Sequence, residues 1–302
     1  MSAIINFAND RTIEQLVIKL SKNIRTYSKN DMPKKFLFVC GKEISTGITT
    51  NRDVIVKQLS KIDNRIKCLV AENLYFDETK YNILHFENLL AEISDYIIII
   101  LESPGTFCEL GAFVNNKKLI NKLIVINEDN INFKKSFITK GPLKLIEKNH
   151  NLYLYQGNMI NSPNIKFLIN KIHKEKPISV KHTQLGATSI ELKSLICDLL
   201  NLIYIFGPVC NYELELIYKK FFNINKINIS NHNNFGISNI NEVLNLLCKM
   251  NLIEYTNKYY VSNKSIVFKN FSFNLSEIAI DSIRATYLCK VHKDIDRARA
   301  LI

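Results

Sequence analysis

The sequence lacks several features that would assign it to common protein classes. None of its apolar runs reaches the length that crosses a membrane, because the longest, residues 96–101, is only as long as a β-strand. Acidic and basic groups occur throughout the first 30 residues, which is not the pattern of a secretory signal. We therefore expect a cytoplasmic protein that does not contact a membrane.

Paired metal-binding cysteines are also missing. The seven cysteines are scattered without a Cys-x-x-Cys pair, and the six histidines are equally dispersed, so we expect no metal site. An odd, unclustered set of cysteines in apolar segments is typical of reduced, buried thiols in the cytoplasm. We also expect no bound cofactor.

Charge says little about partners. The formal net charge is +12, but residues 1–180 carry 26 basic and 18 acidic side chains, and residues 181–302 carry 14 and 10. Neither part is strongly basic, so the charge only weakly favours a polyanionic partner such as nucleic acid.

Short apolar runs alternate with helical patterns in the first part of the chain. This alternation predicts an α/β domain over residues 1–178 with a doubly wound parallel sheet. Ligands bind such sheets at the carboxyl ends of the strands. The expected strands cover residues 35–41, 66–71, 96–101, 122–127 and 152–155, and the expected helices cover residues 12–28, 51–62, 86–94 and 108–116.

The pattern changes after a basic, proline-containing stretch at residues 171–181, which we expect to be a linker. Three predicted helices are followed by a hairpin and a last helix, an order that predicts a winged-helix domain over residues 179–302. The helices are expected at residues 189–205, 212–222 and 239–250, the hairpin at 252–262 and the last helix at 276–300.

The segment ESPGTFCELGAF, residues 102–113, contains the main candidate for a catalytic residue. We expect a glycine turn followed by a helix that starts at Cys108, with Glu109 in its first turn. Glu109 could simply cap that helix, whose dipole would keep the carboxylate ionised. Alternatively, it could face a ligand and stabilise the positive charge that develops on a ribose as its bond to a base breaks. Gly105 would let the ligand approach the backbone closely.

This segment resembles the active-site motif of nucleoside deoxyribosyltransferases, Asp-x-Gly-Thr-x-x-Glu-Leu-Gly. The glutamate of that motif is the nucleophile, so the resemblance implies this role for Glu109. Ser103 stands at the position of the aspartate, which implies altered recognition of the sugar hydroxyls. A phosphoribohydrolase motif, Pro-Gly-Gly-x-Gly-Thr-x-x-Glu, matches less well because its second glycine is absent. The matching residues are Gly105, Thr106, Glu109, Leu110 and Gly111.

A longer resemblance, dense over residues 35–146, is to the effectors of retrons, which are bacterial anti-phage systems. It implies a toxin that joins a deoxyribosyltransferase-like domain to a winged helix. It also implies association with a reverse transcriptase and its branched RNA–DNA hybrid (msDNA), and glutamate-dependent cleavage of N-glycosides including NAD. The related transferases build their sites across subunits, so that resemblance implies an oligomer. The segments that carry it are FLFVCG, AENLYFD, FENLLAEISDYIIIILESPGTFCELGAFVNN and FKKSFITKGPLKLI.

Several other residues are expected near the substrate. Glu87 and Asn88 would begin a helix whose amino end faces the binding edge; capping explains them about equally well, and the resemblance to the retron effector favours ligand contact. Gly41 would permit close approach of a nucleotide, whereas Cys40 beside it is more typical of a core. Asp77 could bind a base or ribose hydroxyl, or be a solvated loop acid. The expected substrate-binding set is completed by Ser103, Gly105 and Thr106.

The helix predicted at residues 239–250 would be the recognition helix of the winged-helix domain. It lacks the arginines of a strong DNA-binding helix, so docking to protein or simple packing stays an alternative. Lysines near the hairpin would contact phosphates. The candidate contacts are Asn239, Asn241 and Asn245 on the helix and Lys258 and Lys264 near the hairpin.

Two functions remain open: an N-glycosidase, and a nucleotide sensor whose winged helix regulates transcription. The intact nucleophile motif favours the enzyme, because a sensor does not need it. NAD has a cationic leaving group that departs without a general acid, and the sequence offers no acid partner for Glu109. We therefore expect hydrolysis of NAD to nicotinamide and ADP-ribose. Cleavage of nucleosides or nucleotides, or deoxyribosyl transfer, is the alternative.

Overall fold

The computed structural model describes residues 14–15, 17–18, 35–42, 49–63, 66–75, 82–129, 136–175, 183–230, 237–263, 277–291 and 294–300. The chain divides into two compact units. One unit comprises residues 34–178, and the other comprises residues 179–302 together with residues 1–33.

A five-stranded parallel sheet forms the centre of the first unit, as the alternating pattern predicts. Its order is β2-β1-β3-β4-β5, so the chain changes direction between the neighbouring strands β1 and β3. Ligand sites of such sheets lie at this switch point. The strands are β1 (Lys35–Cys40), β2 (Ile66–Leu69), β3 (Tyr96–Ile100), β4 (Leu123–Glu128) and β5 (Leu152–Tyr155).

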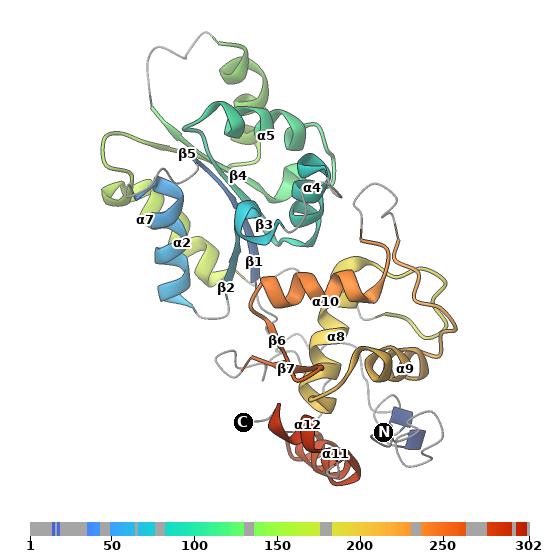
Figure 1. Cartoon of the computed structure of the whole chain (residues 1–302). Helices are drawn as coiled ribbons and strands as arrows, with labels where there is room; N and C mark the ends of the chain where they lie inside the picture. The colour runs from blue at the N-terminus through green and yellow to red at the C-terminus, as the bar shows by residue number, and fades with distance from the viewer. Residues whose placement is uncertain are drawn as a thin grey trace. The chain divides into compact units, whose positions relative to one another are not determined.

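Helices cover both faces of this sheet (Figure 1). On one face, α2 (Asn51–Ile62) and α7 (Pro163–Lys174) pack through apolar side chains onto alternate residues of the strands. The other face is covered by α4 (Ile83–Ile93) and α5 (Pro104–Val114). There the ring of Phe38 meets the ring of Phe113 edge-on, with centroids 6.1 Å apart.

Three features of the first unit differ from the sequence-based expectation. Helices α4 and α5 begin earlier than predicted, at Ile83 and Pro104. Helix α7 was not predicted, and it runs to Lys174, into the stretch expected to be a linker. Short elements were also missed: α3 (Ala71–Leu74), a π-helical turn (Thr139–Leu143), α6 (Lys144–Lys148), and the 3-10 turns Ile120–Lys122 and Met159–Asn161.

The second unit contains three helices followed by an antiparallel hairpin, in the predicted order. A bridge between Val209 and Tyr260 adds a further pairing to the hairpin. The expected last helix is two helices, with Asp294 capping the second. The elements are α8 (Leu192–Phe206), α9 (Asn211–Phe222), α10 (Ile240–Lys249), β6 (Ile253–Thr256), β7 (Tyr259–Ser262), α11 (Glu277–Val291) and α12 (Ile295–Arg299).

The N-terminal residues group with this second unit, whereas the predicted division places them in the first domain. Of these residues, Glu14 carries a carboxylate whose Oε1 lies 3.4 Å from Nζ of Lys220 on α9. The domain boundaries as a whole stay a prediction. Within the described ranges, no helix has the length and apolar character needed to span a membrane.

Candidate active site at the carboxyl ends of the parallel strands

Helix α5 is capped without any help from Glu109. Ser103 is its N-cap, and its Oγ accepts a hydrogen bond from the backbone N–H of Thr106 at 3.5 Å. In return, Oγ1 of Thr106 accepts from the N–H of Ser103 at 3.2 Å and from that of Glu102 at 3.3 Å. The predictions that Glu109 lies in the first turn and could be its cap were therefore wrong, because α5 begins at Pro104 and Glu109 lies in its second turn.

The carboxyl group of Glu109 is mostly buried, and its Oε2 has no hydrogen-bond partner. Burial raises the pKa of Glu109 to about 7, and the charge of Glu72 adds to the rise. A hydrogen bond from the Cys40 thiol and the charge of Arg52 oppose it. The expected effect of the helix dipole, an ionised carboxylate, is thus outweighed by desolvation.

Cys40 brings the end of β1 into the same site. Its side chain is buried, and burial, followed by the negative charges of Glu109 and Glu87, raises the pKa of the thiol well above its ordinary value. The thiol is therefore protonated and donates to Glu109, which excludes a role as a thiolate nucleophile. The sequence-based expectation of a core cysteine holds, and the thiol also touches the candidate nucleophile.

A second carboxyl group of the site, that of Glu87, also has an elevated pKa. Burial, then the charges of Glu109 and Glu72, raises the pKa of Glu87 to about 7. Glu87 lies in the second turn of α4, whose cap is Asn82, so capping does not explain it. Two interacting carboxyl groups of this kind can hold one proton near neutral pH. The site thus contains a second carboxyl group whose raised pKa would let it carry a proton near neutral pH.

Glycine plays different parts at the two predicted positions. A Cβ on Gly41 would lie 2.7 Å from Cβ of Arg52, so Gly41 is needed for α2 to pack against the end of β1. The predicted role of Gly41 in ligand approach stays a prediction. Gly105 is exposed, and a Cβ there would meet only Oγ of Ser103, at 3.9 Å. The backbone at Gly105 is therefore accessible, and its contact with a ligand stays a prediction.

Comparison with known proteins identifies the family to which the chain belongs. The sequence profile described as "STM3845 retron effector protein" matches residues 48–255, which is more than half of the chain. The chain belongs to the STM3845 retron effector family. Of the site residues described in this section so far, the match covers all except Cys40 and Gly41.

Two curated relatives of this retron effector come from Escherichia coli. The "Retron Ec73 putative ribosyltransferase/DNA-binding protein" is 28% identical over 272 residues, which is 82% of this chain and 83% of the relative. The "Retron Ec86 putative ribosyltransferase/DNA-binding protein" is 34% identical over 143 residues, or 46% of this chain and 45% of the relative.

Other residues of the effector's site serve to join its elements. Glu102 accepts from the N–H of Lys42 at 3.0 Å and from Nδ2 of Asn51 at 2.9 Å, which ties the end of β3 to the end of β1 and the start of α2. Arg52 is buried and forms a 2.7 Å ion pair with Glu72. Sequence analysis missed the roles of Asn51, Arg52 and Glu72. The only feature of the sequence that points to these three residues is their position, because each lies at or just after a predicted strand end or helix start.

Of the other residues predicted to contact the substrate, three are hydrogen-bonded within the protein and one lies outside the described residues. The amide of Asn88 donates to the carbonyl of Leu84 at 2.8 Å, so it is engaged within its own helix. Ser103 and Thr106 are occupied with the cap of α5. Asp77 lies outside the described residues.

The candidate nucleic-acid contacts lie in the second unit of the effector. Asn239 caps α10, because its Oδ1 accepts from the N–H of Glu242 at 3.1 Å, and this differs from the predicted base contact. Asn241 and Asn245 are exposed, one turn apart on α10. Lys258 is exposed in the hairpin turn with φ of 73°. Lys264 lies outside the described residues.

Proposed function

We propose that this retron effector is an N-glycosidase that hydrolyses NAD, with Glu109 as the carboxylate that acts on the ribose. The observation that carries the proposal is the unpartnered Oε2 of Glu109, buried at the carboxyl ends of β1 and β3. A buried carboxylate oxygen without a hydrogen bond costs stability unless it serves a ligand. The word "ribosyltransferase" in the names of both relatives supports the same class of chemistry.

The reaction needs little besides this carboxylate. When the bond between C1′ and the nicotinamide nitrogen breaks, its electron pair neutralises the ring cation, and positive charge remains on the ribose. Ionised Glu109 stabilises that charge, either as an ion pair or by forming an ester at C1′. Water then adds to C1′ and releases one proton, which gives ADP-ribose and, in the ester route, frees Glu109.

Cleavage of nucleosides or nucleotides is a second candidate, and Glu87 favours it. A neutral base is a poor leaving group unless a general acid protonates it as the bond breaks. A carboxyl group with a pKa raised to about 7 can supply that proton at neutral pH. In this reaction Glu87 would donate to the base while Glu109 stabilises the sugar.

We further propose that α8, α9, α10 and the hairpin form a winged helix that contacts the retron's branched RNA–DNA hybrid or its reverse transcriptase. Three helices followed by a two-stranded wing, with Val209 pairing to Tyr260, fit this arrangement. Asn241, Asn245 and Lys258 offer exposed polar contacts. Replacing these three by alanine should lower co-purification with the hybrid and the reverse transcriptase, and full recovery would contradict this placement.

Product analysis tests the enzymatic proposal. The purified effector, alone and with its retron partners, is incubated separately with NAD and with deoxynucleosides, and the products are separated by chromatography. We expect nicotinamide and ADP-ribose, and a loss of at least about 1000-fold in Glu109→Gln, which removes the charge but keeps the size. The matched control is Glu147→Gln, an exposed glutamate of α6.

Each other result has a definite meaning. Base release from deoxynucleosides with NAD intact would select the second candidate. A folded Glu109→Gln variant with normal activity would remove Glu109 from the chemistry altogether.

A further inference from the structure

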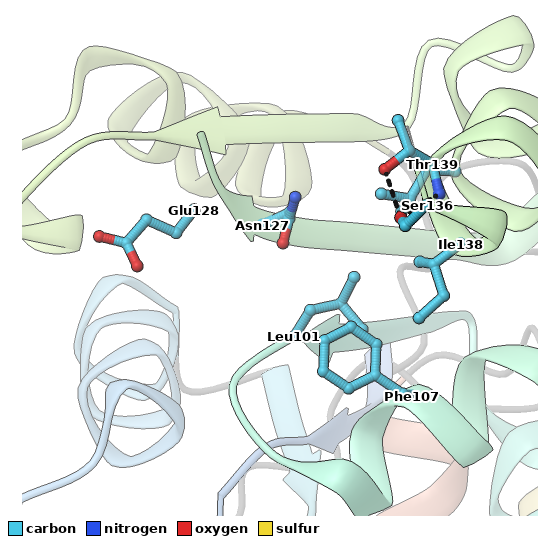
Figure 2. Close-up of a pocket in the computed structure, with 8 residues that line it drawn as sticks. Leu101, Phe107, Asn127, Glu128, Ser136, Ile138 and Thr139 are labelled. Carbon is cyan, nitrogen blue, oxygen red and sulfur yellow. Dashed lines mark hydrogen bonds between the residues drawn. The ribbon is translucent and has the colours of Figure 1, made fainter. Parts of the chain in front are cut away.

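A pocket lies beside α5, at the carboxyl ends of β3 and β4 (Figure 2). Its volume is about 70 Å³, and it opens to solvent, so a ligand would place one edge in it and extend beyond its mouth. It was not part of the predicted site. The residues that line it are Leu101, Phe107, Asn127, Glu128, Ser136, Ile138, Thr139 and Leu143.

This pocket and Glu109 lie on different sides of the same helix. Each residue of an α-helix advances by about 100°, so Phe107 and Glu109 point about 200° apart around α5. Side chains alternate along the strands, and Ile126 packs on the face covered by α2 and α7. Asn127 therefore points to the opposite face, which α5 covers, where it lines the pocket together with Leu101 and Phe107 (Figure 2).

The lining suits a flat ring with a polar edge. Leu101, Phe107 and Ile138 provide apolar surface, and a half-buried phenylalanine can stack on a base. Across the residues that the structure describes, the carboxamide of Asn127 has no hydrogen-bond partner, so both its donor and its acceptor are available. An asparagine amide pairs with the two polar atoms on one edge of adenine. The carboxylate of Glu128 points away from the other lining side chains and takes no part in this arrangement (Figure 2).

The outer wall of the pocket is held in place by its own hydrogen bonds. Oγ of Ser136 lies 3.1 Å from Oγ1 of Thr139 and accepts from the Thr139 N–H at 3.3 Å (Figure 2). The π-helical turn Thr139–Leu143 follows directly and contains Pro142. Such turns occur frequently at functional sites. Hydrogen bonds within this short segment therefore fix the shape of the pocket wall.

We propose that this pocket binds the adenosine half of NAD while the nicotinamide riboside half reacts at Glu109. The inference rests on the proposed function and adds a reason for choosing a dinucleotide over a mononucleotide. A dinucleotide long enough to reach both sides of α5 would cross its start at Gly105, where a Cβ would meet only Oγ of Ser103, 3.9 Å away. Binding energy from the adenosine half then accelerates cleavage at the distant bond.

The first test compares NAD with nicotinamide mononucleotide, which lacks the adenosine half. In the wild-type effector we expect kcat/KM for NAD to exceed that for the mononucleotide by at least about tenfold. Asn127→Leu and Phe107→Leu should lower kcat/KM for NAD toward the mononucleotide value and leave the mononucleotide unaffected. Asn121→Leu is the matched control, because Asn121 is exposed just before the opposite end of β4.

The second test needs no catalysis. Binding of ADP-ribose to Glu109→Gln is measured by calorimetry, with and without Asn127→Leu. Binding that weakens at least about tenfold with Asn127→Leu supports the pocket, even if NAD proves not to be a substrate and the proposed function fails. Equal binding in both variants, or cleavage of NAD with no preference over the mononucleotide, would overturn the inference.

Discussion

Each unit of this effector buries charge, but the two do so in opposite ways. In the second unit, the guanidinium of Arg297 donates to the Tyr287 hydroxyl and to Oε1 of Glu213, both at 2.5 Å, and to the carbonyl of Pro208 at 3.3 Å. The ring of Tyr259 lies 4.6 Å from its central carbon. In the first unit, a carboxylate oxygen of Glu109 has no partner, and the charge of Glu109, after burial, raises the pKa of the nearby carboxyl group of Glu87.

The difference separates a structural network from a reactive site. A buried ion pair supported by several hydrogen bonds holds elements together, here α9, α11, α12 and the hairpin, although Nε of Arg297 itself has no hydrogen-bond partner. A buried carboxyl group without partners titrates near neutrality and is typical of sites that bind or transform a ligand. Variants of each cluster should therefore change stability in opposite directions.

The largest effect on stability is expected from Arg297→Met. This change leaves Glu213 buried without its cation, and breaking such a pair costs roughly 3–5 kcal/mol. Chemical denaturation should show the loss of stability. Arg299→Met is the control, because Arg299 is exposed on the same helix, and its change should stay within about 0.5 kcal/mol. Equal losses in both variants would remove the distinction between the two arginines.

Glu109→Gln should instead stabilise the protein at alkaline pH. The pKa of Glu109 is about 7 in the folded protein against about 4.5 when unfolded, so the folded state binds more protons between these values. The free energy of unfolding therefore falls as pH rises through this window. We expect a gain of roughly 1–3 kcal/mol at pH 8 that shrinks toward pH 5, measured by denaturation at both pH values. A loss of stability in Glu109→Gln at both pH values would show that other groups compensate the charge of Glu109.

The two glycines allow a sharper separation of packing from ligand approach. Gly41→Ala should cost about 1–3 kcal/mol, because its Cβ would meet Arg52 at 2.7 Å. Gly105→Ala should change stability by less than about 0.5 kcal/mol and yet lower kcat/KM for NAD. Thermal melts and kinetics on both variants test this. Full activity of Gly105→Ala would show that no ligand passes close to this backbone.

The last expected effect concerns the pH dependence of cleavage. NAD cleavage requires ionised Glu109, so kcat/KM should fall about tenfold per pH unit below the pKa near 7 and level off above it. If Glu87 must donate a proton to a neutral base, the profile for that substrate should instead be bell-shaped and fall again on the alkaline side. A profile for NAD that is flat from pH 5 to pH 8 would contradict a titrating Glu109.

Much of the architecture could be predicted because apolar patterning specifies it. The five strands are short apolar runs, and their parallel pairing follows from the helices between them. The starts of α4 and α5 were misjudged although their signals were present. Asn82 and Ser103 are good N-caps, and Pro104 is a favoured first helical residue.

The composition of the site could be predicted only in part. Glu109, Cys40 and Glu87 were all singled out, but they meet only because β1 and β3 are neighbours, with Cys40 paired to Ile99. The pKa values depend on burial, which a sequence pattern does not specify for a polar side chain. The pocket beside Phe107 was missed because its residues come from β3, β4, α5 and the turn at residues 136–143.

The grouping of the N-terminal residues with the second unit has a practical consequence for dissecting the protein. Residues 34–178 are, in topological terms, an insertion within the other unit, joined to it by two peptide connections. A fragment that ends at residue 178 would keep Glu14 but lose Lys220, its ion-pair partner. A single proteolytic nick would therefore not release the α/β unit, whereas cleavage near residues 33 and 178 together would.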